Sequence, residues 1–179
     1  LNPVVRYGTD EQKARMLPPI IKREKRACFG VTEPNTGLDT TRLRTKAVLK
    51  GDRYIVHGQK TWTTTAQVAD KILLIARTKD IGETARPMDG LTLFYTDLDR
   101  SKVEVRRIPK MGREHVDSNQ VFIDGLEIPV EDRIGEEGKG FRYLLHGINP
   151  ERILIAAGLV GLGRVALQLS LIHISEPTR

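Results

Sequence analysis

The sequence predicts an α+β protein in which a small β-barrel or sandwich is flanked by helical segments. Between residues 28 and 129, short apolar runs alternate with turns, and no long helical pattern comes between them. Helical patterns occupy both ends of the chain instead. With 179 residues, the chain is long enough for one good core or two small ones.

A helix is expected close to the N-terminus. Thr9 and Gln12 have the spacing of a capping box, with a hydroxyl at the cap and an amide three residues later. The helix is expected to run from about Asp10 to Leu17. Pro18 and Pro19 follow and should end it, because proline lacks the N–H that continues a helix.

Several strands are expected in the middle of the chain. Leu43, Thr45, Ala47 and Leu49 alternate with basic residues, which is typical of a strand with one polar face. Gly51-Asp52 should then turn the chain into a second strand, RYIVHG. Three further runs are strand candidates: KILLIART, LTLFYTDL and NQVFIDGLEI.

The pattern becomes helical again after Pro129, where the segment IGEEGKGFRYLLHGI has glycines followed by a helical run. Asn149-Pro150-Glu151 reads as a helix start, with an asparagine cap, proline at the first position and an acid in the first turn. The run that follows, RILIAAGLVGLGRVALQLSL, is apolar nearly all round, as expected of a helix buried among other helices. We expect its partner helices to lie outside this sequence, and we expect no apolar stretch to approach the length of a membrane span.

Composition narrows the classes of function. The formal charge is +6, from 29 Lys+Arg against 23 Asp+Glu, and the basic residues are scattered. With only four Phe and four Tyr and no nucleic-acid-binding motif, a solvated surface is favoured over an anionic metabolite, and nucleic acid comes last. The single cysteine, Cys28, excludes an internal disulfide and fits a reducing compartment. No metal site is predicted.

The stretch FGVTEPNTGLD, from Phe29 to Asp39, has an unusual composition for a strand end. Pro34 fixes its own φ and biases Glu33 toward extended geometry, while Gly37 allows a backbone conformation that other residues resist. Such a loop should be rigid, with amides free to bind a ligand. A plain β-turn is the alternative interpretation.

Five fragments in order resemble the acyl-CoA dehydrogenase family of flavoproteins. They are YGTDEQKARMLPPI, VTEPNTGLD, GQKTWTTTAQVAD, KMG and VFIDGLEIPVEDRIGEEGKGF. The resemblance implies a truncated form of that fold, with a middle β-barrel between helical domains. The expected divisions are residues 1–26 (end of the N-terminal helical domain), 27–135 (flavin-binding barrel) and 136–168 (start of the C-terminal helical domain). Residues 169–179 resemble translated sequencing-adapter sequence, so a non-native tail is expected there.

The resemblance also implies an FAD site on the barrel. The Thr32 hydroxyl and nearby main-chain amides would bind the pyrimidine edge of the flavin. The Trp62 indole would pack on the ring, and the Thr64 hydroxyl would donate to N5, the atom that accepts hydride. The implied cofactor-binding residues are Phe29, Val31, Thr32, Gly37, Trp62 and Thr64. Leu38 is an implied substrate-binding position, because it stands where the family usually has a serine that contacts substrate or cofactor phosphate. Leucine cannot make that polar contact, so Thr40 or Thr41 is the alternative hydroxyl.

The implied reaction is the α,β-dehydrogenation of an acyl-CoA thioester by a glutamate base and the flavin. Glu151 holds the position of that base in a smaller group of the family, which includes isovaleryl-CoA dehydrogenases. In most members the base lies further downstream, beyond this chain. Read without the resemblance, Glu151 is simply an acid favoured at a helix N-terminus. Asn149 and Arg152 match a stretch that contacts substrate.

Two other functions remain open at this point. One is a flavin monooxygenase or nitroalkane-oxidase-like enzyme on the same fold, in which oxygen reoxidises the flavin. The other is a non-catalytic β-barrel module that binds a partner.

The resemblance implies an electron-transfer flavoprotein as electron acceptor and a homodimer or homotetramer. It also implies a bacterial cytoplasmic or mitochondrial matrix location. Because the chain begins with Leu1, an internal segment of a longer protein is expected, and by itself this segment should be inactive.

Overall fold

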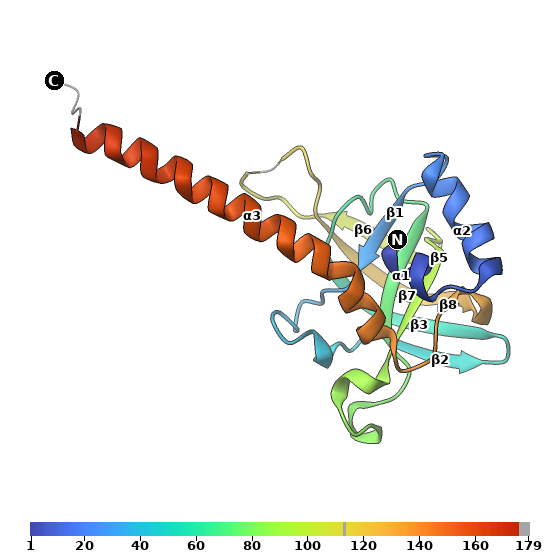
Figure 1. Cartoon of the computed structure of the whole chain (residues 1–179). Coiled ribbons are helices and arrows are strands. Elements are labelled where there is room, and N and C mark those ends of the chain that lie inside the picture. The colour runs from blue at the N-terminus through green and yellow to red at the C-terminus, as the bar shows by residue number, and fades with distance from the viewer. Residues whose placement is uncertain (113, 176–179) are drawn as a thin grey trace. The chain divides into compact units, whose positions relative to one another are not determined.

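The computed structural model describes residues 1–112 and 114–175 (Figure 1). The chain divides into two compact units, one formed by residues 1–144 and the other beginning at residue 145. Each unit is described separately below. The mixed sheet and flanking helices of the described residues confirm the expected α+β class, whereas the finer boundaries at residues 26, 135 and 168 stay predictions.

Two short helices open the first unit, α1 (Asn2–Tyr7) and α2 (Asp10–Ile21). The expected capping box is confirmed. The Thr9 hydroxyl accepts from the Gln12 amide N–H at 3.2 Å, and the Gln12 side chain accepts from the Thr9 N–H at 2.9 Å. The same Gln12 side chain donates to the carbonyls of Glu131 and Arg133, so this cap also attaches the start of α2 to the chain segment of residues 131–133.

The expected end of α2 at Leu17 was wrong, because the helix continues through Pro18 and Pro19 to Ile21. A proline removes its own N–H but still offers a carbonyl to later residues. Lys22 N–H uses that carbonyl and donates to Pro18 O at 2.9 Å. The chain leaves the helix at Arg23, whose φ of 60° lies in the left-handed region.

The strands form one eight-stranded mixed sheet in the order β6-β7-β3-β2-β4-β5-β8, with β1 pairing parallel to β4. Their bounds are β1 (Ala27–Gly30), β2 (Lys46–Lys50), β3 (Arg53–Thr63), β4 (Lys71–Arg77), β5 (Leu91–Asp97), β6 (Val103–Arg107), β7 (Asn119–Pro129) and β8 (Arg133–Ile134). Four short 3-10 helices lie between them: η1 (Thr40–Arg42), η2 (Ile81–Glu83), η3 (Pro87–Gly90) and η4 (Val130–Asp132).

The expected hairpin is present. Lys50 pairs with Arg53 across the two-residue turn, and Gly51 has the positive φ (62°) that such a turn requires. The expected alternation of buried and exposed side chains in β2 is confirmed only in part: Ala47 is buried, but Leu49 is exposed. Strand β6 was missed: its sequence VEVRR is charged and lies at the sheet edge, where a strand needs only one partner.

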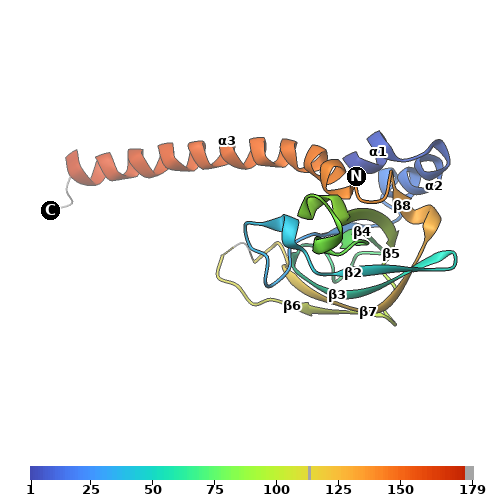
Figure 2. The same ribbon diagram turned by 90° about the horizontal axis from the view of Figure 1, so that it is seen from below.

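The sheet curls so that its two halves face each other across a core. Figure 2 shows β3, β7 and β6 in one layer and β4 and β5 in the other. The core between them is filled by inward side chains from both layers, among them Val56, Ile72, Phe94, Val121 and Ile128. Strand β4 is buried on both faces, which explains why KILLIART is almost continuously apolar.

Helix α3 (Gly140–Ser175) unites the helical run expected before Asn149 with the helix expected after it. The helix start expected at Asn149-Pro150-Glu151 was wrong, because Pro150 lies inside the helix. The helix begins at Gly140, which packs directly on β5. A Cβ added at Gly140 would lie 2.4 Å from the Leu93 nitrogen, so only glycine allows this approach.

The part of α3 beyond residue 144 exposes its apolar side chains within the described chain. The exposed residues are Ile153, Leu154, Ile155, Leu159, Val160, Leu162, Val165, Leu167, Leu169, Leu171, Ile172 and Ile174. By length and composition this helix could cross a membrane, so the expectation that no segment approaches a span was wrong. A core helix of a soluble protein has the same composition, and burial against further helices remains our interpretation. Of the expected tail, residues 169–175 continue α3, and residues 176–179 lie outside the described residues.

Candidate functional site

The two segments that the sequence singled out lie side by side. The Thr61 N–H donates to the Thr32 carbonyl at 2.8 Å, which joins the turn after β1 to the end of β3. Val31 and Thr32 stand on one side of this bond, and Trp62 stands on the other. The structure therefore brings together the halves of the predicted flavin site within the first unit.

Aromatic side chains point outward from both segments. In β1, Phe29 is 36% exposed while its neighbours Cys28 and Gly30 are buried, as the two-residue period of a strand requires. Trp62 is 59% exposed although both of its neighbours are buried. Thr64 is exposed as well. These residues make an outward-facing surface with apolar rings and a hydroxyl.

A β-bulge sets the direction of Trp62. The register between β3 and β7 shifts between Lys60 and Thr63, and Trp62 within that shift has a φ of 59°. A left-handed backbone at a bulky residue costs about 1–3 kcal/mol and persists only where its surroundings enforce it. Bulges of this kind redirect a side chain next to a functional site.

Residues that the sequence did not single out hold the loop after Trp62. The Asp117 carboxylate accepts from the Thr65 N–H at 2.9 Å, and the Asn119 amide donates to the Thr63 carbonyl at 2.9 Å. Burial pushes the pKa of Asp117 upward, but hydrogen bonds from Asn119 and from backbone amides outweigh it and leave this pKa below its usual value.

Arg100 supports the same loop from the turn between β5 and β6. Its guanidinium donates to the carbonyls of Ala66 at 2.7 Å, Ala69 at 2.8 Å and Gln67 at 3.2 Å. Nothing in the local sequence around Arg100 signals this role, because the three carbonyls come from a loop more than thirty residues earlier.

A buried ion pair lies beneath the two segments. Lys60 Nζ donates to Glu33 Oε1 at 2.9 Å, and both side chains are almost fully buried. Lys60 Nζ also donates to the Val31 carbonyl at 3.1 Å. The remaining capacity of the carboxylate is filled by the backbone N–H groups of Arg44 at 2.6 Å and Thr45 at 2.9 Å.

The environment shifts the pKa of each partner. Burial lowers the pKa of Lys60 to about 8, and the Glu33 carboxylate offsets only part of that effect. Burial alone would raise the pKa of Glu33. The Lys60 ammonium and the hydrogen bonds from Lys60, Thr45 and Arg44 outweigh it and hold the pKa of Glu33 below its ordinary value of 4.5.

The depressed pKa of Glu33 predicts an acid-dependent contribution to stability. A carboxyl group with a folded pKa below its unfolded value stabilises the fold fully above the unfolded pKa, near 4.5. That contribution is lost as pH falls through the folded pKa. The stability cost of Glu33→Gln should therefore be largest between pH 5 and 7 and shrink at lower pH, measured by urea unfolding of both proteins.

A matched control is available on β6. Glu104→Gln neutralises a fully exposed carboxylate that pairs with Arg106 at 2.6 Å, and it should cost little at any pH. A cost of Glu33→Gln that does not change between pH 7 and pH 3 would contradict the expectation.

The turn after Thr32 is a β-turn closed by the Thr36 N–H, which donates to the Glu33 carbonyl at 3.2 Å. Pro34 occupies its second position, as the sequence suggested. The reason given for Gly37 was wrong, because its φ is outside the left-handed region and a Cβ there would meet no atom within 4 Å. The turn is therefore held mainly by the Glu33 carboxylate beneath it rather than by a special glycine conformation.

The residues after this turn differ in whether their side chains are free to contact a ligand. Leu38 is fully exposed. The Thr41 hydroxyl donates to the Asp39 carboxylate. This hydrogen bond is the largest cause of the lowered pKa of Asp39. Thr41 is therefore engaged within its own loop, which leaves Thr40 as the better replacement for the missing serine hydroxyl.

Of the predicted substrate residues, Leu38 lies in the first unit, whereas Asn149 and Arg152 lie on α3 in the second. Arg152 Nη1 donates to the Asn149 side-chain oxygen at 3.3 Å, so these two residues are brought together on one helix face. Glu151 is exposed between them in sequence.

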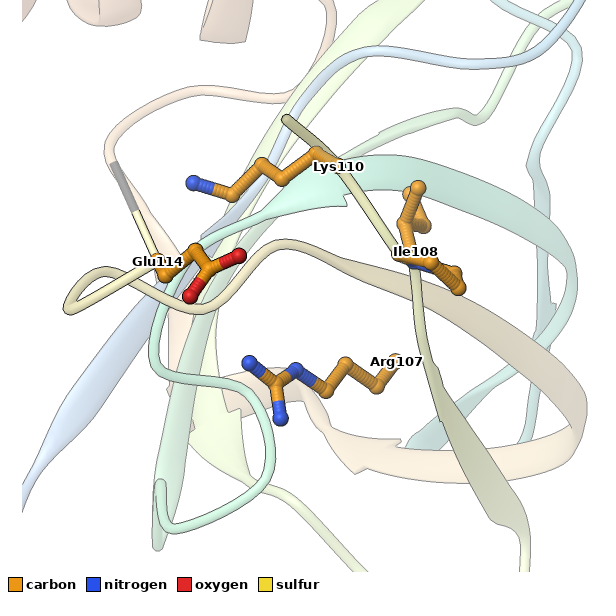
Figure 3. Close-up of a pocket in the computed structure, with 5 residues that line it drawn as sticks. Arg107, Ile108, Lys110 and Glu114 are labelled. Carbon is orange, nitrogen blue, oxygen red and sulfur yellow. The ribbon is translucent and has the colours of Figure 1, made fainter. Parts of the chain in front are cut away.

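A separate hollow of about 310 Å³ lies at the loop between β6 and β7. Its lining residues are Arg107, Ile108, Pro109, Lys110 and Glu114, and Figure 3 shows both cationic side chains and the Glu114 carboxylate extending around the same space. It contains the lysine of the KMG fragment. None of the predicted cofactor-binding residues lines it.

Comparison with known proteins decides the family. Residues 28–126 match the family model described as acyl-CoA dehydrogenase, middle domain. The chain belongs to the acyl-CoA dehydrogenase family. The matched range contains the outward-facing aromatic residues, the Thr32–Thr61 contact and the Glu33–Lys60 pair.

Individual acyl-CoA dehydrogenases are similar over nearly the whole chain. The acyl-CoA dehydrogenase AFT10-1 of Alternaria alternata is 38% identical over 92% of this chain, and the short-chain-specific enzyme of Clostridium acetobutylicum is 32% identical over 95%. The crystal structure of an acyl-CoA dehydrogenase from Geobacillus kaustophilus superposes with a TM-score of 0.86 at 31% identity over 99% of the chain. This chain spans 37%, 44% and 46% of these proteins, respectively.

Proposed function

We propose that the protein containing this chain is an FAD-dependent acyl-CoA dehydrogenase, and that the first unit provides part of its flavin site. The observation that carries the proposal is the pair of outward-facing aromatic residues, Phe29 and Trp62, on segments joined by the Thr32–Thr61 hydrogen bond. Exposed rings of this kind are stabilised when a planar ligand covers them. Membership of the family supports the same assignment.

The residues present fit a flavin. Its ring system is a flat apolar surface with a polar pyrimidine edge, and the chain offers aromatic rings beside the hydroxyls of Thr32 and Thr64. In the proposal, Val31 and Thr32 would bind the polar edge and Trp62 would cover the ring. Thr64 would donate to N5, and the turn through Gly37 would lead toward the phosphates.

The proposed chemistry needs a hydride acceptor, which is the flavin, and a base, which is Glu151. When bound, FAD would supply the acceptor for the β-hydrogen of the substrate, which leaves as hydride with the electron pair of its C–H bond. Glu151 takes the α-proton, so that the electrons of that bond form the Cα–Cβ double bond of the product. Asn149 and Arg152, joined by their hydrogen bond, would orient the thioester next to the base.

The substrate, partners and location are part of the proposal. Acyl-CoA is the proposed substrate class, an electron-transfer flavoprotein the electron acceptor, and a dimer or tetramer the assembly. The proposed location is the bacterial cytoplasm or the mitochondrial matrix. The apolar residues exposed along α3 support burial of this helix against additional helices of the assembled protein.

The proposal predicts that the purified protein is yellow and is bleached by substrate. Acyl-CoAs of varied length and branching would be mixed with it under anaerobic conditions while the flavin absorbance near 450 nm is recorded. Loss of absorbance with at least one acyl-CoA, and none with free CoA, is the expected result. Absence of flavin, or bleaching by no acyl-CoA, would reject the function. Rapid reoxidation of the bleached enzyme by air would instead favour the monooxygenase or oxidase alternative.

A further inference from the structure

Each of the two segments proposed to contact the flavin carries a buried ionisable residue. Glu33 follows Thr32 directly, and Lys60 lies two residues before Trp62. Their side chains turn inward while the aromatic residues turn outward. The ion pair that they form therefore joins the two halves of the proposed site from beneath, at an N–O distance of 2.9 Å.

Both members of the ion pair also form hydrogen bonds with backbone groups near the proposed site. Lys60 Nζ donates to the Val31 carbonyl at 3.1 Å, one residue before Thr32. The Glu33 carboxylate binds the N–H groups of Arg44 and Thr45, which fixes the far end of the turn. Moving either side chain would shift the peptide groups that carry Val31 and Thr32 relative to Trp62.

Stability alone explains this arrangement poorly. Two buried charges are expensive to desolvate, and apolar or neutral pairs of similar volume are often as stable. The lowered pKa of Lys60, about 8, reflects this desolvation. A neutral pair of similar volume could fill the same space with little loss of stability. Positioning the backbone around it is therefore a better explanation for the Glu33–Lys60 pair.

We propose that Glu33 and Lys60 are positioning residues for the flavin-binding surface. Acting through the Val31 carbonyl and the backbone of residues 44 and 45, the pair fixes the spacing between Thr32 and Trp62. The inference rests on the proposed function. It predicts that neutralising both residues weakens FAD binding by about tenfold or more, the loss seen when supporting partners of ligand-binding groups are removed at metal sites.

The test compares FAD binding with folding in the protein that contains this chain. The main variant is the double substitution Glu33→Gln with Lys60→Met, which removes both charges while leaving similar volumes. Its control, Glu104→Gln with Arg106→Met, neutralises an exposed pair on β6. FAD affinity is measured by titrating apoprotein while flavin fluorescence is recorded. The visible circular dichroism of bound flavin reports its geometry, and urea unfolding of the apoprotein reports stability.

The expected result is a tenfold or larger rise in the Kd for FAD and a changed visible spectrum, in an apoprotein that still unfolds in one cooperative transition. Wild-type affinity and spectrum in the double variant would overturn the inference and leave only a structural role. If the double variant does not fold, Lys60→Arg must show the same loss, because its longer planar head cannot keep both contacts of Nζ. Wild-type affinity there would overturn the inference too. A wild-type protein that binds no FAD would overturn the proposed function together with this inference.

Discussion

Glu151→Gln is expected to slow the bleaching of the flavin by acyl-CoA by about 10²–10⁴-fold, the usual contribution of a positioned general base. The glutamine has nearly the same shape and can still donate and accept hydrogen bonds, but it cannot take the α-proton. Binding of the thioester should change little, because Asn149 and Arg152 keep their mutual contact. The effect should therefore fall on the rate of bleaching at saturating substrate rather than on the substrate concentration required.

The measurement is anaerobic stopped-flow absorbance with the best acyl-CoA found for the wild type. Glu136→Gln is the matched control, because Glu136 is exposed, precedes the same helix and forms an ion pair with Lys139 on the surface. It should bleach at the wild-type rate. Wild-type bleaching by Glu151→Gln would keep the family assignment and move the base to a residue outside α3.

The sequence was sufficient for the elements whose signals are local. The Thr9 capping box and the Gly51 hairpin depend on residues within a few positions of one another, and both are present. The family resemblance supplied the relation between Thr32 and Trp62, which no local pattern contains. In the structure, the Thr61–Thr32 hydrogen bond holds the two segments next to each other.

The features that sequence reasoning missed depend on distant partners. Pro150 looked like a helix start, but the packing of Gly140 on β5 begins α3 ten residues earlier, and the helix continues through the proline. Arg100 and Asp117 hold the loop after Trp62 through residues far away in sequence. Local propensity cannot reveal such contacts, because their energy comes from tertiary packing and from burial of polar groups.

Arg77 is a further residue whose role appears only in the fold, and its loss should have a large effect on stability. It lies at the end of β4, nearly fully buried, and no carboxylate of the described residues forms an ion pair with it. Its guanidinium donates to four carbonyls instead: Thr41 at 2.7 Å, Leu43 at 2.8 Å, Pro87 at 2.9 Å and Lys79 at 3.3 Å. Burial lowers the pKa of Arg77, and the more distant charges of Asp80 and Glu33 offset part of this.

Arg77→Met should reduce the free energy of unfolding by about 3–5 kcal/mol, because one buried and three partly buried carbonyls lose a charged donor at once. Arg77→Lys should recover part of this loss, since one ammonium group can reach only some of the four carbonyls. Arg86→Met, which removes an exposed pair with Asp89, should cost less than about 1 kcal/mol. Urea unfolding followed by far-ultraviolet circular dichroism measures all three.

The position of Arg77 connects this stability to the proposed site. Two of its four acceptors, Thr41 and Leu43, lie in the loop that follows Leu38, and the next residues, Arg44 and Thr45, bind the Glu33 carboxylate. The loop is therefore anchored by a buried cation at one end and by a buried anion at the other. Arg77→Met should release the first anchor, so FAD affinity should fall in the fraction that remains folded. Equal stability of Arg77→Met and Arg86→Met would show that the buried guanidinium does not hold this loop.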